Sequence, residues 1–108
     1  MKNTLSSLKC RACEGLIYKL KPAEIKKNLF QIKEWKVKEN KLFKEYKFPN
    51  FKSSLFFVNK LGKIAEQQGH HPNISFTWGK VEVTIYTHAV NGLTINDFIL
   101  AAKYDKIK

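Results

Sequence analysis

The hydrophobic positions in the first half of the chain follow a helical spacing and then an alternating one. Pro22 suits the first turn of a helix, and apolar residues recur after it at i, i+4 and i+7, so we predict a short helix over Pro22–Lys33. From Trp35 to Phe48, apolar residues alternate with lysines and acids, which indicates two antiparallel strands with a turn near Glu39–Lys41. The apolar helix positions are Ile25, Leu29 and Ile32, and those of the strands are Trp35, Val37, Leu42, Tyr46 and Phe48.

The second half repeats this change of spacing. Pro49 stops the strand, Asn50 is suited to cap a longer helix, and Gly69 is suited to end it. Two alternating runs around Gly79-Lys80 predict a second hairpin, and Thr94-Ile95-Asn96-Asp97 reads as a capping box that opens a last helix. The long helix contains Leu55, Val58, Leu61, Gly62 and Ala65, the strands contain Ile74, Phe76, Trp78, Val81, Val83 and Ile85, and the last helix contains Phe98, Ile99 and Ala102.

The resulting element order is α-β-β-α-β-β-α, which predicts an α+β fold: a four-stranded antiparallel sheet with three helices packed on one face. With 108 residues and 44% apolar composition, we expect a single domain over residues 1–108, with a loop-like lead segment over residues 1–20. The other sheet face would be partly open or covered by a second copy. Tyr86 shares that face with Glu82 and Thr84, which makes it a candidate oligomer interface.

Composition narrows the class of protein. The longest apolar run, Phe98–Ala102, is far below the roughly 20 residues that span a bilayer, and Met1–Lys9 lacks an apolar signal, so we expect a cytoplasmic protein without membrane contact. The net charge of +11 rests on 20 basic residues, of which Arg11 is the single arginine, and lysines alternate with acids as in Lys33-Glu34. Base and phosphate recognition favour arginine, so we interpret the charge as a solvated surface and do not expect nucleic acid as a partner, with non-specific polyanion binding as the less favoured alternative.

The chain contains two cysteines, Cys10 and Cys13, which form a C-x-x-C pair in the lead segment. A structural zinc site needs four ligands, and the sequence offers neither a second cysteine pair nor a nearby histidine. We therefore interpret them as reduced thiols, with zinc binding and a redox couple as less favoured alternatives.

Residues that carry chemistry near neutral pH gather in the second half. Glu66 and His70 are four apart at a helix end, so the carboxylate can reach the imidazole, while the adjacent His71 points the opposite way. Antiparallel pairing brings His88, at the end of its strand, to the same rim as these two histidines. This arrangement predicts an acid/base site for a flat polar ligand. The candidate residues are Glu66, His70, His71, Pro72, Trp78, His88 and Asp97.

Several of these residues have a structural alternative. Asp97 is explained either by the capping box alone or by a place in the site, and Trp78 is either core or a wall of the pocket. Three histidines and Glu66 could serve zinc, but adjacent histidines cannot easily aim at one ion, and no H-E-x-x-H helix is present. The sequence also lacks a nucleophile elbow. We therefore favour acid/base chemistry without a metal.

The motif Glu66-x3-His70-His71-Pro72-x5-Trp78-x9-His88-x8-Asp97 resembles the signature of the pterin-4a-carbinolamine dehydratases. The resemblance continues upstream through Cys-Arg-Ala-Cys-Glu-Gly, which is typical of bacterial members, and through Phe48–Phe51. It implies four antiparallel strands backed by three helices. It also implies loss of water from 4a-hydroxytetrahydrobiopterin to give quinonoid dihydropterin, which recycles the tetrahydropterin without a metal or redox cofactor.

The resemblance further implies roles for individual residues. His70, His71 and His88 match the catalytic histidines; we expect His70 and His88 to be the acid/base pair and His71 to orient the pterin. Glu66 would tune His70, and Asp97 would lie near His88 or the ligand. The implied partners are the pterin, a second copy in a homodimer or homotetramer, and an aromatic amino acid hydroxylase. A protein-binding, assembly or transcriptional coactivator role on the same fold is the alternative.

Overall fold

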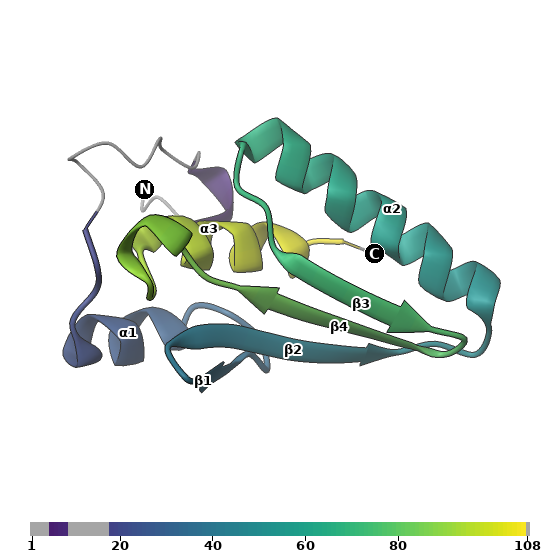
Figure 1. Ribbon diagram of the computed structural model, residues 1–108, viewed down its shortest axis with the longest axis horizontal. Coiled ribbons are helices and arrows are strands. Elements are labelled where there is room, and N and C mark those ends of the chain that lie inside the picture. Colours follow the sequence, from purple (N-terminus) through teal and green to yellow (C-terminus); the bar gives the residue numbers. More distant parts are fainter. Residues whose placement is uncertain (1–4, 9–17, 108) are drawn as a thin grey trace.

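The centre of the molecule is a four-stranded antiparallel sheet (Figure 1). Its strands are β1 (Lys36–Lys38), β2 (Lys41–Lys47), β3 (Asn73–Thr77) and β4 (Lys80–Ile85), and they lie in the order β1-β2-β4-β3. The computed structural model describes residues 5–8 and 18–107. The pairing of β2 with β4 joins the two hairpins into one sheet and runs from Leu42 opposite Ile85 to Lys47 opposite Lys80.

Two helices, α2 (Phe51–Gln68) and α3 (Ile95–Tyr104), cover one face of the sheet, and α1 (Pro22–Leu29) lies at one end of the molecule (Figure 1). Two 3-10 turns complete the described part, η1 (Leu5–Ser7) and η2 (His88–Val90). The order of α-helices and strands confirms the predicted α+β fold, α-β-β-α-β-β-α. Within the described residues, no helix combines the length and apolar character needed to pass through a membrane.

The core forms where the inward side chains of the sheet meet α2 and α3. Along β4 the alternation is strict: Val81, Val83 and Ile85 are fully buried, while the residues between them are half-buried. Burying one such side chain contributes about 1.5–3 kcal/mol relative to leaving it exposed. Leu61 of α2 and Phe98 of α3 are also fully buried. The apolar residues whose alternation predicts β4 are therefore the ones that pack the sheet against the helices.

The helix ends are set by local sequence. The side chain of Asn50 accepts a hydrogen bond from the Ser53 amide at 2.8 Å, as expected of an N-cap. Gly69 ends α2 in the left-handed region, with φ of 63°. Thr94 caps α3, and its backbone amide donates to the Asp97 carboxylate at 2.8 Å, which confirms the predicted capping box. These caps fix where the chain turns towards the site.

The first helix is shorter than predicted. It ends at Leu29 rather than Lys33, and the chain then turns so that Ile32 and Trp35 are both buried. Asp105, the residue after α3, accepts hydrogen bonds from the Lys33 amide at 2.8 Å and from the Trp35 indole at 3.0 Å. These bonds span about seventy positions of sequence. A local helical spacing does not reveal such tertiary contacts.

The lead segment is described only in part. Residues 5–7 form η1 instead of a simple loop, and Leu5 is buried among core residues. The Lys103 ammonium donates to the Ser6 carbonyl at 2.9 Å, which ties η1 to α3. Cys10 and Cys13 lie outside the described residues.

Candidate active site

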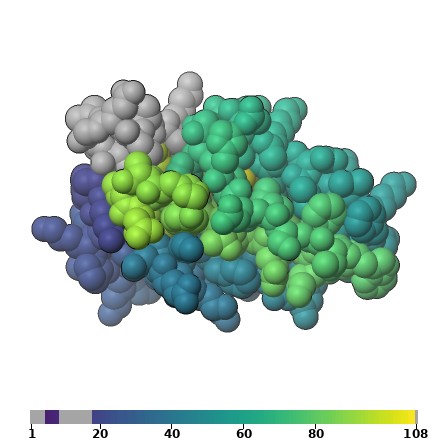
Figure 2. Space-filling model, in the orientation of Figure 1, coloured from purple at the N-terminus to yellow at the C-terminus, as the bar shows by residue number. Residues whose placement is uncertain are grey.

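The three histidines lie at one end of the β3–β4 hairpin. His70 and His71 follow α2 and lead into β3, whereas His88 begins η2 just beyond β4. In the hairpin, Asn73 pairs with Thr84, so the chain that leaves α2 and the chain that enters η2 meet at the same end of the sheet. Figure 2 shows η2, in light green, at the surface beside the end of α2. The hairpin therefore places the three histidines on a common rim, as its predicted pairing requires.

His70 forms a buried pair with Asp97. Its Nε2 atom lies 2.6 Å from Oδ1 of Asp97, the imidazole is 9% exposed and the carboxylate is fully buried. The other carboxylate oxygen accepts from the Thr87 hydroxyl at 2.9 Å and from the Thr94 amide at 2.8 Å. Asp97 therefore holds three donors, and it both caps α3 and contacts His70. The capping box is therefore confirmed, and the same carboxylate also contacts His70, so capping is not its only interaction.

Thr87 is a member of this network that the sequence reasoning missed. It is buried, and its oxygen lies 2.8 Å from the Thr94 hydroxyl. Because Thr87 donates its proton to Asp97, Thr94 must donate in that contact. A signal was available: Thr87 continues the inward alternation of Val83 and Ile85, and a hydroxyl at an inward position needs a buried partner.

Glu66 contacts His71 and not His70, so the predicted Glu66–His70 pair is wrong. The Glu66 carboxylate lies 2.5 Å from Nε2 of His71, and both side chains are largely exposed. The reason is the left-handed conformation of Gly69, after which the His70 amide bonds back to Ala65 at 3.2 Å. His70 then turns into the core and His71 outward, towards the last turn of α2. The prediction that the two adjacent histidines point opposite ways is confirmed.

Trp78 lies at the far end of the hairpin from the histidines. It follows β3, and the six residue steps from Pro72 to Trp78 correspond to roughly 20 Å along an extended strand. The indole is 66% exposed, so the interpretation of Trp78 as core is wrong. Within one chain, it also does not reach the rim that His70 and His88 occupy. Pro72 is half-buried and connects His71 directly to β3.

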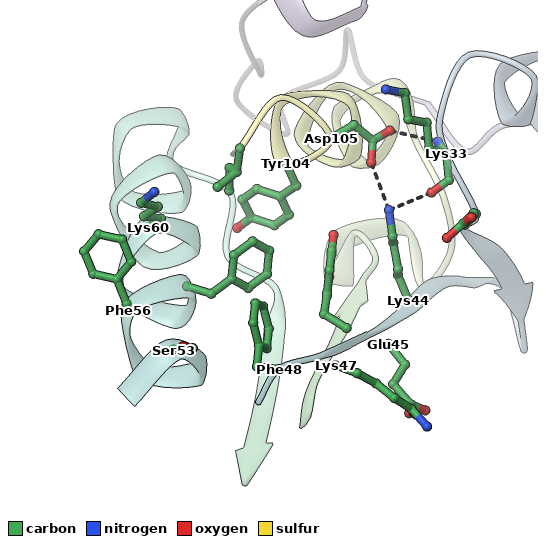
Figure 3. A pocket seen from close by; sticks show the side chains of 14 residues that line it. Lys33, Lys44, Glu45, Lys47, Phe48, Ser53, Phe56, Lys60, Tyr104 and Asp105 are labelled. Atoms are coloured by element: carbon green, nitrogen blue, oxygen red, sulfur yellow. Dashed lines mark hydrogen bonds and ion pairs between the residues drawn. The ribbon is translucent and has the colours of Figure 1, made fainter. Parts of the chain in front are cut away.

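A separate cavity of about 630 Å³ lies between α2 and β2 (Figure 3). Its fourteen lining residues include none of the seven candidates. The view shows Lys44 pointing to Asp105, and the two form an ion pair at 3.3 Å. Burial raises the pKa of Tyr46, another lining residue, and its buried hydroxyl has no hydrogen-bond partner among the described residues. The cavity and the histidine rim are therefore distinct features of the molecule.

The side chains that could bind a metal form two separate pairs, His70 with Asp97 and His71 with Glu66. In residues 5–8 and 18–107, no group of three or more histidine, cysteine or acidic side chains is arranged to hold a metal ion. What the rim does offer is imidazole groups with fixed carboxylate partners. Such groups can move protons to and from a bound ligand.

Comparisons with known proteins agree on one family. A family model described as Pterin 4 alpha carbinolamine dehydratase matches residues 18–107. A Rickettsia canadensis protein with the provisional name of a pterin-4-alpha-carbinolamine dehydratase is 52% identical over 103 residues, which are 94% of each chain. A Rubrobacter xylanophilus protein with the same provisional name is 41% identical over 95% of this chain and 97% of its own.

Two solved structures share the fold. One is described as a transcriptional coactivator/pterin dehydratase from Brucella melitensis; it superposes with a TM-score of 0.77 at 27% identity, covering 81% of this chain and 95% of its own. The other is a pterin dehydratase-like protein described as a RuBisCO assembly factor in the alpha-carboxysome. Its TM-score is 0.56 at 27% identity, over 67% of this chain and 83% of its own. By the family match and the near full-length relatives, the chain belongs to the pterin 4 alpha carbinolamine dehydratase family.

Proposed function

We propose that the protein is a dehydratase that removes water from a 4a-hydroxytetrahydropterin, such as 4a-hydroxytetrahydrobiopterin, to give quinonoid dihydropterin. The observation that carries the proposal is the buried His70–Asp97 pair on a rim that also holds His71 and His88. The reaction needs one group that protonates the leaving hydroxyl and another that takes a proton from a ring nitrogen. Family membership supports the same reaction class.

His70 is suited to be the base. An ionised carboxylate only accepts hydrogen bonds, so Nε2 of His70 must carry the proton that faces Asp97. In the neutral ring, Nδ1 then has the lone pair. Asp97 stabilises the imidazolium that forms when Nδ1 takes up a proton, and the donors from Thr87 and Thr94 keep the carboxylate in place.

His88 is suited to be the acid, because it lies exposed on the same rim. It would protonate the C4a hydroxyl as the carbon–oxygen bond breaks, and the ring nitrogen would lose its proton to His70. The two transfers balance, so no net proton is consumed. His71, held by Glu66, would contact and orient the pterin, which assigns Glu66 to His71 in place of the expected tuning of His70. Pro72 would support this loop.

The test is a stopped-flow assay on freshly generated carbinolamine. His70→Ala and His88→Ala should each slow dehydration by about 10² or more, since a positioned proton-transfer group contributes that much. Phe30→Ala, at a side chain that is 85% exposed and far along the chain from the histidines, is the control and should keep the wild-type rate. Near-normal rates in both histidine variants would contradict the assignment.

A binding role is the second candidate. Helix α2 exposes Phe51, Leu55 and Phe56, by 49%, 41% and 63% of their surfaces, and apolar residues grouped in this way favour an interface. The neighbouring structures described as a coactivator and as an assembly factor point to the same possibility. We propose a second copy of the chain, in a homodimer or homotetramer, as one partner. Because aromatic amino acid hydroxylases produce the carbinolamine, they are the proposed source of substrate.

Calorimetric titration with a tetrahydropterin analogue separates the two functions. Binding that is lost in His70→Ala supports the dehydratase. Absence of both binding and activity in the wild-type protein would favour a pure scaffold.

A further inference from the structure

We propose that Tyr86 is a positioning residue that fixes the ring of His88 with its proton on Nε2, and that Lys41 holds Tyr86 in place. The inference rests on the proposed function, because it explains how His88 is prepared to donate a proton. It involves two residues on the open face of the sheet that belong to neither carboxylate pair.

The β1–β2 turn sets the position of Lys41. Its two central residues, Glu39 and Asn40, have φ of 50° and 63°, the left-handed pair that suits a two-residue hairpin turn. This turn fixes the register of β2, in which Leu42 pairs with Ile85. One step further along an antiparallel pair, Lys41 is opposite Tyr86. The Lys41 ammonium accordingly lies 4.6 Å from the centroid of the Tyr86 ring.

Tyr86 in turn holds His88. Its hydroxyl oxygen lies 3.0 Å from Nδ1 of His88, and the two ring centroids are 4.2 Å apart. The residue between them, Thr87, is buried and bonded to Asp97, so the backbone cannot shift easily. Thr87 also exchanges backbone hydrogen bonds with Gly92, at 2.9 and 3.4 Å, which closes the loop after β4. With the backbone anchored, the tyrosine hydroxyl determines how the exposed imidazole is turned.

The chemistry of the pair decides which atom holds the proton. A phenol O–H is a better donor than a neutral imidazole N–H, and the imidazole nitrogen is a better acceptor than the phenol oxygen. Tyr86 therefore donates to Nδ1, and the neutral His88 keeps its proton on Nε2. The cation of Lys41 over the ring draws electron density from the phenol and strengthens this donor. His88 then presents an N–H outward. When Nε2 gives this proton to the leaving hydroxyl, Nδ1 takes up the Tyr86 proton, so the ring stays neutral and the resulting phenolate lies beside the Lys41 ammonium.

The two proposed catalytic histidines are thus prepared in opposite states. Asp97 takes the Nε2 proton of His70 as a hydrogen bond and makes Nδ1 of that ring the acceptor. Tyr86 occupies Nδ1 of His88 and makes Nε2 of that ring the donor. One side chain selects the base and the other selects the acid, before any ligand binds.

The first test is ¹⁵N NMR of the His88 ring in the wild-type protein and in Tyr86→Phe, which keeps the aromatic ring and removes only the hydroxyl. The wild-type ring should be a single Nε2–H tautomer with a hydrogen-bonded Nδ1. In Tyr86→Phe the Nδ1 signal should move to the position of a ring that exchanges between both tautomers. An unchanged His88 spectrum would overturn the proposal. This measurement does not depend on dehydratase activity, so it stands even if the proposed function fails.

The second test uses the stopped-flow assay. Tyr86→Phe should lower kcat by about tenfold with KM unchanged, less than the roughly 10² expected for loss of His88 itself. Lys41→Met should shift the His88 spectrum and kcat in the same direction by a smaller amount. The matched control is Lys38→Met, because Lys38 lies over the Phe43 ring at the same 4.6 Å on the same hairpin. Equal effects of the two lysine variants would contradict the role of Lys41.

Discussion

Nε2 of His70 and Oδ1 of Asp97 lie 2.6 Å apart across 27 positions of sequence, in the most deeply buried part of the rim. The same carboxylate caps α3 through the Thr94 amide. The Asp97 side chain therefore connects the start of α3 to His70, which follows the end of α2. A change at Asp97 should affect the stability of the fold and the proton state of His70 together.

Asp97→Asn should slow dehydration by about 10²–10⁴. The amide oxygen would remain with its two donors, Thr87 and Thr94, which turns the NH₂ group towards His70. Nε2 must then accept, the ring proton moves to Nδ1, and the proposed base is lost. Because one strong acceptor is replaced, the free energy of unfolding should also fall by roughly 1–3 kcal/mol. Stopped-flow kinetics and ¹⁵N NMR of the His70 ring measure the two effects.

Asp105→Asn is the matched control for Asp97→Asn. Asp105 is the other aspartate at α3, and it accepts from Lys33, Trp35 and Lys44. Its replacement should lower stability by a similar amount, about 1–3 kcal/mol, and leave kcat unchanged. If Asp97→Asn retained full activity with the His70 proton on Nδ1, His70 would not be the base.

Gly62, within α2, and Gly69, just after it, allow a matched test of what directs the His70 side chain. A Cβ added at Gly62 or at Gly69 would meet no atom within 4 Å, but only Gly69 has a positive φ, at 63°. Gly69→Ala should therefore lower the free energy of unfolding by about 1 kcal/mol through backbone strain alone. Gly62→Ala should raise it by up to about 1 kcal/mol, because alanine is the better helix former. Thermal unfolding of both variants gives the comparison.

The Gly69→Ala variant should also lose part of its activity, because the left-handed residue directs His70 into the core and His71 outward. Gly62→Ala should keep the wild-type rate. If Gly69→Ala were destabilised yet fully active, the orientation of the His70 side chain would not depend on Gly69.

Local features were predictable from the sequence. The helix ends near the site are marked by Asn50, Gly69 and the Thr94–Asp97 box. Their interactions reach no further than four residues, so these boundaries follow directly from residue type. The hairpin pairing that brings His88 towards His71 follows from alternation in β3 and β4. These short-range rules account for the fold class and for the location of the rim.

Side-chain direction and long-range pairing were not predictable in the same way. Glu66 pairs with His71 and not with His70 because of the dihedral angles of Gly69. Residue spacing does not specify those angles. Trp78 follows the last paired residue, Thr77, so strand alternation no longer determines which way it points. The bond from Asp97 to His70 joins two elements whose packing depends on the whole core.

The hydroxyl of Tyr46 gives a prediction about pH. Burial, followed by the negative charge of Asp105, raises the pKa of Tyr46 from its ordinary value of 10.0. Below pH 10.0 both the folded and the unfolded tyrosine are protonated, so stability does not change through this group. Above it the unfolded state loses the proton first and binds fewer protons, so the free energy of unfolding falls as pH rises. Tyr46→Phe should remove this contribution to the loss of stability at alkaline pH.

At neutral pH, Tyr46→Phe should leave the protein as stable as the wild type or more stable by about 1 kcal/mol, because the buried hydroxyl has no hydrogen-bond partner in the described residues. Tyr104→Phe is the matched control, since the buried Tyr104 hydroxyl donates to the Leu61 carbonyl at 2.9 Å. That change should cost about 1 kcal/mol. Urea unfolding of both variants near pH 8 and above pH 10 separates the two effects. A loss of stability in Tyr46→Phe equal to that in Tyr104→Phe would mean that the Tyr46 hydroxyl is paired in solution.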